Sequence, residues 1–465
     1  MQKTPYIIEQ IDTYQCNDLL FYFTEFAERP WSLLIDSAGS GEHSNQYDII
    51  LHSPAFTLTC KNKQTVVTNT GTNIKKVSFD DPIEEARKLH AILKQSVTKI
   101  NGEFPENLPF IAGVAGLFGY DLGRNFENLP SPHLATTENA KGEYDCPDMA
   151  LGVYQRSLIL DKVNRVIYDC RPVNMSPVSL GNMAQPSTQP FSLTTPWQSN
   201  FTKSDYIAGL EKIHCYLTAG DCYQVNFAQR FSAQYEGSEW HAYLKLRESN
   251  KAPFSAFIRL PQSSVISISP ERFLSVRNAK VQTKPIKGTR PRSSDPVIDA
   301  GNAHCLLNSS KDRAENLMIV DLLRNDISKH CLPHSVTVPQ AFKLESYAAV
   351  HHMVTTIEGQ LDERSDPFTL LRDAFPGGSI TGAPKIRAMQ IIDELEPNAR
   401  NVYCGSIGYI GLHDDMDTSI CIRTLLCEKG KIYCWAGGGI VLDSDPESEY
   451  QETLDKVNKI LPVLL

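Results

Sequence analysis

Hydrophobic and polar residues over positions 1–170 follow the pattern of short strands joined by turns, as in FTLTCKNKQTVVTN (56–69). One stretch differs. DDPIEEARKLHAILKQSV (80–97) has the spacing of an amphipathic helix, with Asp81 placed to cap it and Pro82 in its first turn. The first part of the chain is therefore predicted to be mostly sheet, with one clear helix.

A change of composition divides the chain. Residues 171–203 are rich in Pro, Ser, Thr, Asn and Gln, which is typical of a linker. After them, SDYIAGLEKIHCYLTAGDCYQVNFAQRFSA (204–233) predicts a helix, a Gly-Asp turn and a strand, and strands alternate with helices from there on. We therefore expect an N-terminal domain over 1–170 and a C-terminal domain over 204–465.

Two predicted helices of the second domain carry groups of carboxylates. SKDRAENLMIVDLLRND (310–326) is almost continuously apolar from Leu317 to Leu323, so this part is predicted to be buried. Asp312 and Glu315 are three residues apart and share the face of its first turns.

The second acidic helix is DSDPESEYQETLDKVNKIL (443–461), with Asp445 as its expected cap. Glu449, Glu452 and Lys456 fall on one face of it. Carboxylates near a helix start are stabilised by the helix dipole and need no ligand. If both groups face one cavity, however, their charges repel one another and a divalent cation relieves the repulsion. Mg²⁺ fits, because it binds a few carboxylates, keeps waters and uses oxygens of the substrate.

The overall charge narrows the class of partner. The 465 residues carry a net charge of −9, which argues against a protein that binds nucleic acid through a basic face. Any basic site is therefore local and suited to a small anion. The start of the chain has no apolar core long enough for a signal peptide, no run is long enough for a membrane span, and the twelve cysteines form no CxxC pair. We expect a cytoplasmic protein with reduced thiols.

One Gly-rich segment has the groups for such an anion. FPGGSITGAPKIRAMQIIDELEP (375–397) has a turn followed by a helix that carries Lys385 and Arg387. Ala383 and Pro384 stand where a phosphate-binding P-loop has Lys and Ser or Thr, so nucleotide binding is rejected.

Two other cations are candidates. TSICIRTLL (418–426) is predicted to be a strand with Arg423 inside an apolar run, and a buried arginine needs an anion from the protein or from a ligand. Lys287 lies within TKPIKGTRPR (283–292), at what the pattern predicts to be a strand end followed by a tight turn. It could belong to a solvated basic loop, form an anion clamp, or act as a nucleophile.

The order of these segments resembles that of the chorismate-utilising enzymes, a family that includes component I of anthranilate synthase and of aminodeoxychorismate synthase, and the isochorismate and salicylate synthases. The shared motifs are dense over 204–465 and extend into the first domain. They are PWSLLIDSA (30–38), GLFGYD (116–121), SPERF (269–273), TKPIKGTRPR, AENLMIVDLLRND, VHHMVTT (350–356), FPGGSITGAPKIRAM, YCGSIGYIG (403–411), SICIRT and AGGGIVLDSDPESEYQETLDK.

The resemblance implies an α/β fold of mixed type, with two large antiparallel sheets packed with helices outside. It also implies a magnesium ion that holds one carboxylate of chorismate. Glu315 and Glu452 match the glutamates that bind this ion, with Glu449 and Asp312 in support. Family members often have glutamate at the position of Asp312, so its shorter side chain suggests a contact through water.

The remaining substrate contacts are also implied by the resemblance. Glu271 matches the general acid that helps to expel the 4-hydroxyl, and His352 matches a histidine near the ring. The groups expected to bind the other carboxylate, the pyruvyl arm or nearby atoms are Arg423, Tyr403, Lys456, Thr289, Gln224 and the backbone of Gly437, Gly438 and Gly439.

Two positions distinguish the family members. Lys287 stands where anthranilate synthases usually have alanine, and it resembles a lysine proposed to attack C2 of chorismate before ammonia attacks C4. Attack needs the neutral amine, so a pKa of about 10.4 must be lowered; burial and the nearby Lys284, Arg290 and Arg292 are expected to do this. A lysine that only pairs with a substrate carboxylate is the alternative. Gln224 stands where isochorismate and salicylate synthases have a lysine base, a role that glutamine cannot fill.

The resemblance therefore implies amination of chorismate at C4 for 4-aminobenzoate and folate biosynthesis, with ammonia from a separate glutamine amidotransferase subunit. Anthranilate synthesis is the first alternative, and a non-catalytic subunit that binds chorismate or tryptophan is the second. LIDS (34–37) resembles the tryptophan-contact segment of anthranilate synthases, so Ser37 is expected either to touch a bound tryptophan or to end a plain strand.

Overall fold

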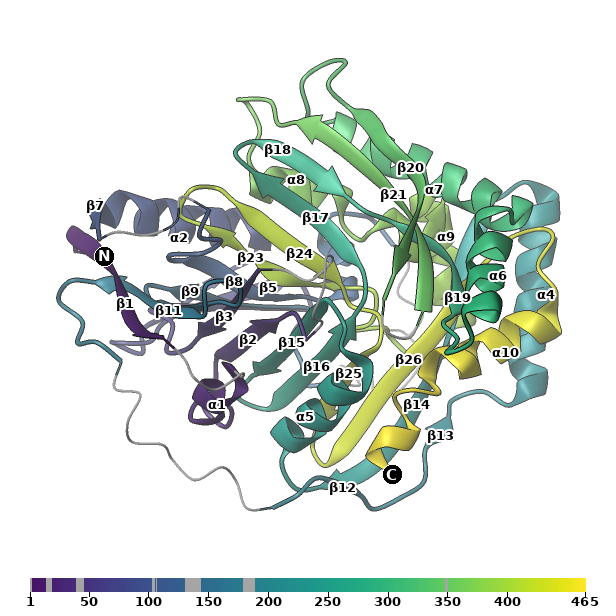
Figure 1. The fold of residues 1–465 in the computed structure, drawn as a ribbon, viewed down its shortest axis with the longest axis horizontal. Helices are drawn as coiled ribbons and strands as arrows, with labels where there is room; N and C mark the ends of the chain where they lie inside the picture. The colour runs from purple at the N-terminus through teal and green to yellow at the C-terminus, as the bar shows by residue number, and fades with distance from the viewer. Residues whose placement is uncertain are drawn as a thin grey trace.

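Two large sheets pack against each other, with helices at the outside (Figure 1). The computed structural model describes residues 2–13, 19–38, 46–102, 105, 107–129, 144–178, 189–347 and 350–465. This mixed α/β architecture confirms the predicted fold class. Among the described residues, no helix is long and apolar enough to cross a membrane.

The larger sheet contains strands from both halves of the chain, antiparallel apart from the β1–β7 pair. Two short strands, β13 (Gln198–Ser199) and β22 (Gly382–Ala383), also pair with β14. In spatial order the other strands are β12 (Ser192–Leu193), β14 (Gln224–Glu236), β26 (Lys431–Ile440), β25 (Thr424–Glu428), β16 (Ser263–Ser269), β15 (Phe254–Arg259), β2 (Ser32–Asp36), β3 (Tyr47–Leu51), β10 (Ser157–Asp161), β11 (Val166–Pro172), β1 (Thr4–Thr13) and β7 (Val97–Asn101).

The smaller sheet is antiparallel and also draws on both halves. Strand β20 (Thr337–Ser346) pairs with β21 beside the main path. In spatial order the other strands are β19 (Ile286–Pro291), β21 (Val350–Gln360), β18 (Lys280–Thr283), β17 (Arg272–Arg277), β24 (Met416–Ile420), β23 (Ser406–Gly411), β8 (Gly113–Phe118), β9 (Met149–Tyr154), β4 (Phe56–Lys61), β5 (Gln64–Asn69) and β6 (Lys75–Ser78).

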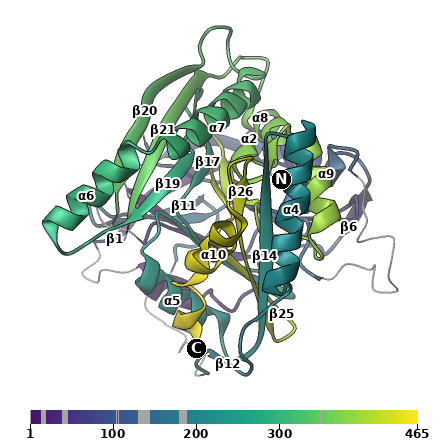
Figure 2. The same cartoon turned by 90° about the vertical axis from the view of Figure 1, so that its right-hand side faces the viewer.

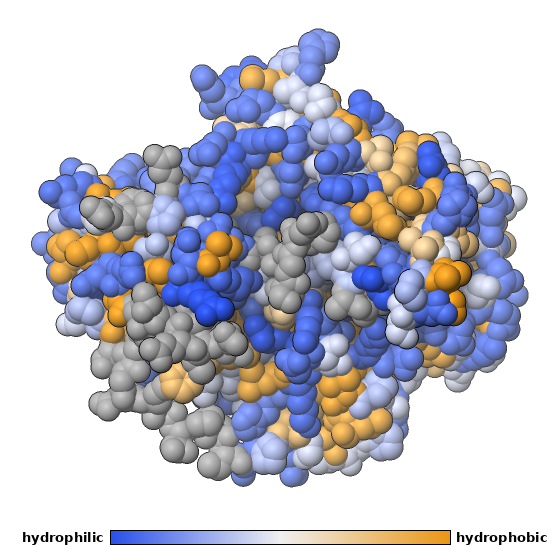
Figure 3. All heavy atoms as spheres, in the orientation of Figure 1, coloured by the Kyte–Doolittle hydropathy of each residue, from blue (hydrophilic) through white to orange (hydrophobic). Residues whose placement is uncertain are grey.

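Most helices belong to the second half of the chain. Helix α10 lies against β26 and beside α4 (Figure 2). The face of the molecule seen in the first orientation is mostly hydrophilic, with separate apolar patches (Figure 3). The helical segments are α1 (Leu19–Thr24), α2 (Pro82–Ser96), η1 (Tyr120–Asn125), α4 (Lys203–Ala219), α5 (Glu239–Asn250), α6 (Pro296–Leu307), α7 (Ser310–Ser328), α8 (Pro367–Ala374), η2 (Gly378–Ile380), α9 (Lys385–Leu395), α10 (Pro446–Val457) and η3 (Pro462–Leu464).

The two halves of the chain lie side by side within both sheets. The strands β1–β11 are neighbours of one another, and so are the strands that follow them. The halves meet where β2 pairs with β15 and where β8 pairs with β23. Within the predicted linker, residues 179–188 lie outside the described residues and the last part contains β12 and β13. The domain boundary itself stays a prediction.

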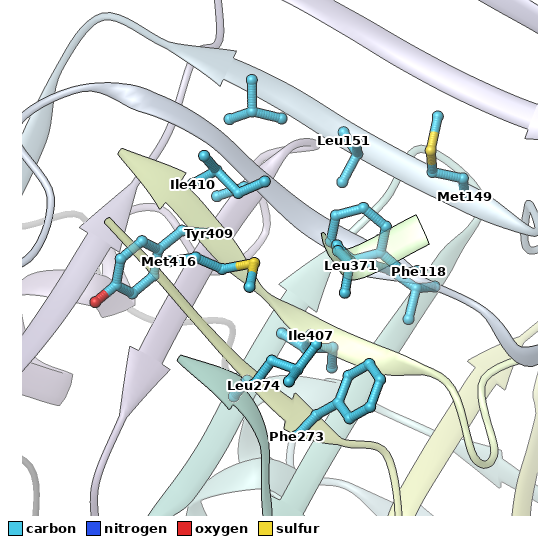
Figure 4. Close-up of a cluster of buried hydrophobic side chains, with 14 of the residues drawn as sticks. Phe118, Met149, Leu151, Phe273, Leu274, Leu371, Ile407, Tyr409, Ile410 and Met416 are labelled. Carbon is cyan, nitrogen blue, oxygen red and sulfur yellow. The ribbon is translucent and has the colours of Figure 1, made fainter. Parts of the chain in front are cut away.

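An apolar core between the sheets joins the two halves (Figure 4). Phe118 and Leu151 come from the first half, and Phe273, Ile407 and Met416 come from the second; all five are buried. Burying a side chain of this kind stabilises the fold by about 1.5–3 kcal/mol. The core therefore fixes β23 and β24, whose ends lead into the site described below.

The predicted helix caps are present. The carboxylate of Asp81 accepts a hydrogen bond from the backbone N–H of Ile83 at the start of α2. The carboxylate of Asp445 accepts a hydrogen bond from the backbone N–H of Ser448 at the start of α10, and both hydrogen bonds are 2.9 Å long. Each cap satisfies an N–H group that has no partner within its own helix.

Helix α7 covers the predicted range, but the prediction that its apolar run is buried throughout is wrong. Leu317 is 58% exposed. The helix buries only the face that carries Ile319 and Leu323, and Leu317 lies well away from that face.

Candidate active site

Lys287 lies at a bulge in β19 rather than at a strand end. The register of β19 against β21 shifts between Ile286 and Thr289, and Gly288 has a φ of +79°. A Cβ on Gly288 would come within 3.0 Å of the carboxyl carbon of Asp312. Glycine therefore allows both the backbone conformation and the close approach of β19 to the acidic helix α7.

The surroundings of Lys287 favour its neutral amine. Burial is the main cause that lowers the pKa of Lys287. Glu315 and Glu271 raise this pKa, Lys456 lowers it and Glu452 raises it, and the net shift is downward. The lysine is thus close to carboxylates from two helices and from the link between β16 and β17.

Burial lowers the pKa of Lys287, as the sequence predicts, but the cation that lowers it most is Lys456 and not one of the three neighbours in the sequence. Each neighbour has a carboxylate partner that offsets its charge: Lys284 with Glu345 at 2.7 Å, Arg290 with Asp312 at 3.2 Å and Arg292 with Asp299 at 2.9 Å.

Glu271 follows β16 and is 6% exposed. Burial raises the pKa of Glu271 to about 7, against the opposing effects of Lys287, Ser379 and Arg423. The hydroxyl of Ser379 donates a hydrogen bond to its Oε1 at 3.3 Å. A carboxyl group with this pKa retains a proton in a large fraction of molecules near neutral pH, as a general acid must.

The two groups of carboxylates face each other across Lys311. The Nζ atom of Lys311 lies 4.0 Å from Glu315 on α7 and 3.8 Å from Glu449 on α10. Burial raises the pKa values of Glu315 and Glu449, and neighbouring carboxylates add to this. Glu452 differs, because Lys456 at 2.6 Å lowers its pKa. Carboxylates that are far apart in the sequence thus come together at one place.

The chemistry of this donor set fits Mg²⁺. The ion is usually bound through one or two carboxylates, with waters and substrate oxygens in the remaining positions. Within the described ranges, no three His, Cys, Asp or Glu side chains are close enough to hold a metal ion by themselves. A cation held by two carboxylates together with the substrate agrees with this coordination and with the lack of a three-ligand cluster. The ammonium of Lys311 lies between Glu315 and Glu449, where such a cation would bind.

The sequence predicts that Arg423 lies inside a strand, and this is wrong. Arg423 lies between β24 and β25 and has a φ of +52°. Burial lowers the pKa of Arg423, against the effect of Glu271. In the part of the chain that the structure describes, its guanidinium forms no ion pair within 4.0 Å. A desolvated guanidinium of this kind suits an anionic ligand.

Tyr403 lies just before β23, with its ring stacked on Trp435 of β26 at 6.2 Å between centroids and 5° between planes. The Nζ atom of Lys456 donates a hydrogen bond to the carbonyl of Gly437 at 2.8 Å. The tyrosine and the lysine thus both contact the strand that carries the three glycines.

Two of these glycines face opposite sides of β26, as successive strand residues do. A Cβ on Gly438 would lie 3.0 Å from Oε2 of Glu449, and a Cβ on Gly439 would lie 2.9 Å from Nε2 of Gln224. Side chains at either position would push site residues away, so the absence of a Cβ brings both groups close to the backbone.

Gln224 is a buried amide without partners. It is 0% exposed, and neither its Nε2 nor its Oε1 forms a hydrogen bond to any described residue. Leaving such a group unpaired costs about 1–3 kcal/mol. A ligand or a water molecule at this position would satisfy it.

His352 and Thr289 lie opposite each other on β21 and β19. The hydroxyl of Thr289 is 2.9 Å from Nδ1 of His352, and the ring of Tyr347 is 5.5 Å from the imidazole, edge to face. Burial lowers the pKa of His352 to about 3, so the imidazole is neutral near pH 7.

Lys311 and Ser379 were not identified as site residues from the sequence. Lys311 is four residues before Glu315, a helical spacing that signals an ion pair. Ser379 gave no signal, because it contacts a residue 108 positions away along the chain.

The start of α9 does not supply free cations for an anion, which corrects another expectation. Lys385 is 3.1 Å from Asp326 and donates to the carbonyl of Ala374 at 2.8 Å. Arg387 is 3.0 Å from Asp221. These contacts hold helices and turns together within the protein.

A separate cavity lies between the two sheets near β2. Asp36, Tyr47 and Phe254 are among its lining residues. Ser37 is not part of that lining, and its backbone N–H and hydroxyl contact Asp48 at 2.9 and 3.3 Å. A contact between Ser37 and tryptophan stays a prediction.

Comparison with known proteins identifies the family of the chain. Residues 38–462 match the family described as chorismate binding enzyme. The chain is 48% identical over 448 residues to aminodeoxychorismate synthase component 1 of Escherichia coli K12, covering 96% of this chain and 95% of that one. It is 47% identical to the protein of the same name from Salmonella typhimurium LT2, over 95% and 94% of the two chains. Its fold matches the crystal structure of anthranilate synthase component I from Streptococcus pneumoniae TIGR4 with a TM-score of 0.75, at 27% identity over 91% of this chain and 95% of that one.

Proposed function

The chain belongs to the chorismate binding enzymes, and we propose that it acts as component 1 of an aminodeoxychorismate synthase, converting chorismate and ammonia to 4-amino-4-deoxychorismate. The observation that carries this function within the family is the half-buried Lys287, whose amine has a lowered pKa and lies near Glu271. Its product is a precursor of 4-aminobenzoate and folate.

Two displacements account for amination at C4. The neutral amine of Lys287 attacks C2 of chorismate, both conjugated double bonds of the ring shift, and the C4–O bond breaks while Glu271 donates its proton, so that water leaves. Ammonia then attacks C4, both double bonds shift back, and the C2–N bond to Lys287 breaks with its electron pair returning to the amine. The Glu271 carboxylate takes the proton that the new C4 ammonium group loses, and both residues regain their starting forms.

Separate groups bind the two carboxylates of the substrate. Arg423 has a guanidinium free of ion pairs in the described residues, and Tyr403 is fixed against Trp435. Together with the N–H groups of the glycine strand they suit the carboxylate of the pyruvyl arm. His352 would lie near the ring, and burial together with the nearby Arg423 keeps its imidazole neutral.

We assign the binding of Mg²⁺ to Glu315 and Glu452, with Glu449 in support and Asp312 acting through water. When bound, the ion would supply positive charge to the second carboxylate of chorismate. Burial, and to a smaller extent the neighbouring carboxylates, raise the pKa values of Glu315 and Glu449, and a bound cation would offset both effects. These side chains orient the ring for attack by Lys287.

The relatives are named as one component of a synthase, so a partner component is expected. We propose that the partner is a glutamine amidotransferase that supplies ammonia, because the second displacement needs ammonia and the match to component 1 spans nearly the whole chain. Free ammonia should replace the partner in vitro.

We also propose that the cavity near β2 binds tryptophan. Ile35, Pro253 and Phe254 give it apolar walls, and the side chain of Tyr47 is among the groups that line it. The middle parts of β23 and β24 also line this cavity, and these strands lead to Tyr403 and Arg423. A bound tryptophan would be either regulatory or structural.

The cysteines that the structure describes are free thiols, most of them buried. We infer that the protein works in a reducing compartment such as the cytoplasm. Their pKa values are raised by burial where a shift is resolved, as for Cys404, so these thiols are not nucleophiles.

The product separates the proposal from its rivals. The purified chain is incubated with chorismate, Mg²⁺ and ammonia, with and without aminodeoxychorismate lyase. We expect 4-aminobenzoate only when the lyase is added. Direct release of pyruvate and fluorescent anthranilate would instead identify an anthranilate synthase. Tight chorismate binding without turnover would identify a non-catalytic subunit.

A further inference from the structure

A buried arginine lies behind the site. The side chain of Arg400 is 1% exposed. Its Nε and Nη2 donate to the two carboxylate oxygens of Glu396 at 2.9 and 2.5 Å, and other N–H groups donate to the carbonyls of Asn226 at 2.9 Å and Ile380 at 3.2 Å. Because a buried charge is costly without partners, this complete set of contacts holds Arg400 in one position.

The Arg400–Glu396 pair supports the glycine strand through β14. Arg400 binds the carbonyl of Asn226, which pairs with Gly439 of β26. Glu396 accepts a hydrogen bond from the N–H of Ala228 at 2.9 Å, and Ala228 lies opposite Gly437. The position of this part of β26 therefore depends on the pair.

The same guanidinium contacts two aromatic rings. Its central carbon lies 4.9 Å from the ring centre of Tyr120 and 5.5 Å from that of Tyr403. Such cation–π contacts are attractive when they are desolvated. Tyr403 is therefore fixed by Arg400 as well as by Trp435.

We propose that Arg400 is a positioning residue for the pocket that receives the carboxylate of the pyruvyl arm. The proposal rests on the function assigned above to Tyr403 and the glycine strand. Arg400 is too deeply buried to touch the substrate. It acts through Tyr403 and β14, whereas Lys287 lies on β19, an element that Arg400 does not contact in the described structure. Losing it should weaken chorismate binding more than it slows the chemical steps.

Two variants separate positioning from stability. Arg400→Lys keeps the charge beside Glu396 but loses the planar fork. The double variant Glu396→Gln with Arg400→Met removes both charges, so no unpaired charge is left buried. Arg156→Lys is the matched control. Arg156 is a partly buried arginine that forms a fork with Asp169 in the first half of the chain, and its Nε lies 2.9 Å from that carboxylate.

For chorismate we expect the KM of Arg400→Lys and of the double variant to rise about 5-fold or more, with kcat within about 2-fold. The melting temperature of the double variant should be closer to the wild-type value than that of Arg400→Lys, while the KM of the double variant stays raised. Arg156→Lys should leave KM unchanged. The proposal would be overturned if Arg400→Lys had the wild-type KM. It would also be overturned if both the KM and the melting temperature of the double variant returned to the wild-type values.

The assay also distinguishes this proposal from the proposed function. KM is measured from chorismate consumption, whichever product forms. If wild-type protein released anthranilate, the assignment of amination at C4 would fail, while a raised KM in both Arg400 variants would still support positioning. If the wild-type product is as proposed and KM does not move, only the positioning role fails.

Discussion

The hydroxyl of Ser379 donates a hydrogen bond to the buried carboxyl group of Glu271, at 3.3 Å. Burial raises the pKa of Glu271 to about 7, and the Ser379 hydroxyl is one of the groups that limit this rise. The contact therefore influences the pH range in which Glu271 keeps the proton that it donates in the proposed mechanism.

Replacing Ser379 by alanine should move the alkaline limb of the kcat/KM profile to higher pH. The general acid works only in its protonated form, and the loss of a donor to the carboxylate raises the pKa by about 0.5–1 unit. The profile is recorded at a constant concentration of uncharged ammonia. Ser379→Thr keeps a hydroxyl and should behave like the wild type. An alkaline limb that does not move in Ser379→Ala would show that this hydroxyl does not influence the acid.

Replacing Lys287 by alanine should lower the rate of C4 amination by about 1000-fold or more, because the first displacement loses its nucleophile. Product formation from chorismate and ammonia is the readout. Lys284→Ala is the control, since Lys284 is paired with Glu345 at 2.7 Å and has no role in the displacements. Comparable losses in the two variants would point to the charge of the loop rather than to one nucleophile.

Removing divalent cations should stop turnover, and added Mg²⁺ should restore it. Glu315→Gln and Glu452→Gln should each raise the Mg²⁺ concentration needed for half-maximal activity by about 10-fold or more. Calorimetry of Mg²⁺ binding in the presence of chorismate gives an independent readout. Glu447→Gln is the control on the same helix, because Glu447 is 63% exposed and pairs with Lys203. Full activity in excess chelator would exclude the proposed metal site.

Replacing Gln224 by leucine should stabilise the protein while lowering kcat/KM. The amide is buried without partners, so its removal should raise the free energy of unfolding by about 1 kcal/mol. Denaturant unfolding measures the change. Gln229→Leu is the opposite case, because Gln229 is equally buried but hydrogen-bonded to Ser199 and Thr453, at 2.6 and 2.5 Å. A loss of stability in both variants would mean that the Gln224 amide is satisfied.

Local signals predicted much of this architecture, because the features concerned depend on residues only a few positions apart. The cap at Asp81 and the helices that carry Glu315 and Glu452 are of this kind. The family motifs then predicted the fold, which the structure confirms, together with a set of site residues.

Features set by contacts between distant segments could not be predicted from local pattern. Arg423 looked like a residue within a strand, but its chain leaves β24 and enters β25 at a positive φ. Lys385 looked free to bind an anion, but Asp326 from another helix is its partner. The lowered pKa of Lys287 depends on burial and on Lys456, which is far along the chain.

The covalent role of Lys287 is tested most directly by mass spectrometry of the protein incubated with chorismate and Mg²⁺ in the absence of ammonia. The account predicts a mass gain equal to chorismate less one water, located on the peptide that contains Lys287 and lost when ammonia is added. Two results together would contradict the account: Lys287 of the wild-type protein stays unmodified, and the Lys287→Ala variant still aminates chorismate at C4.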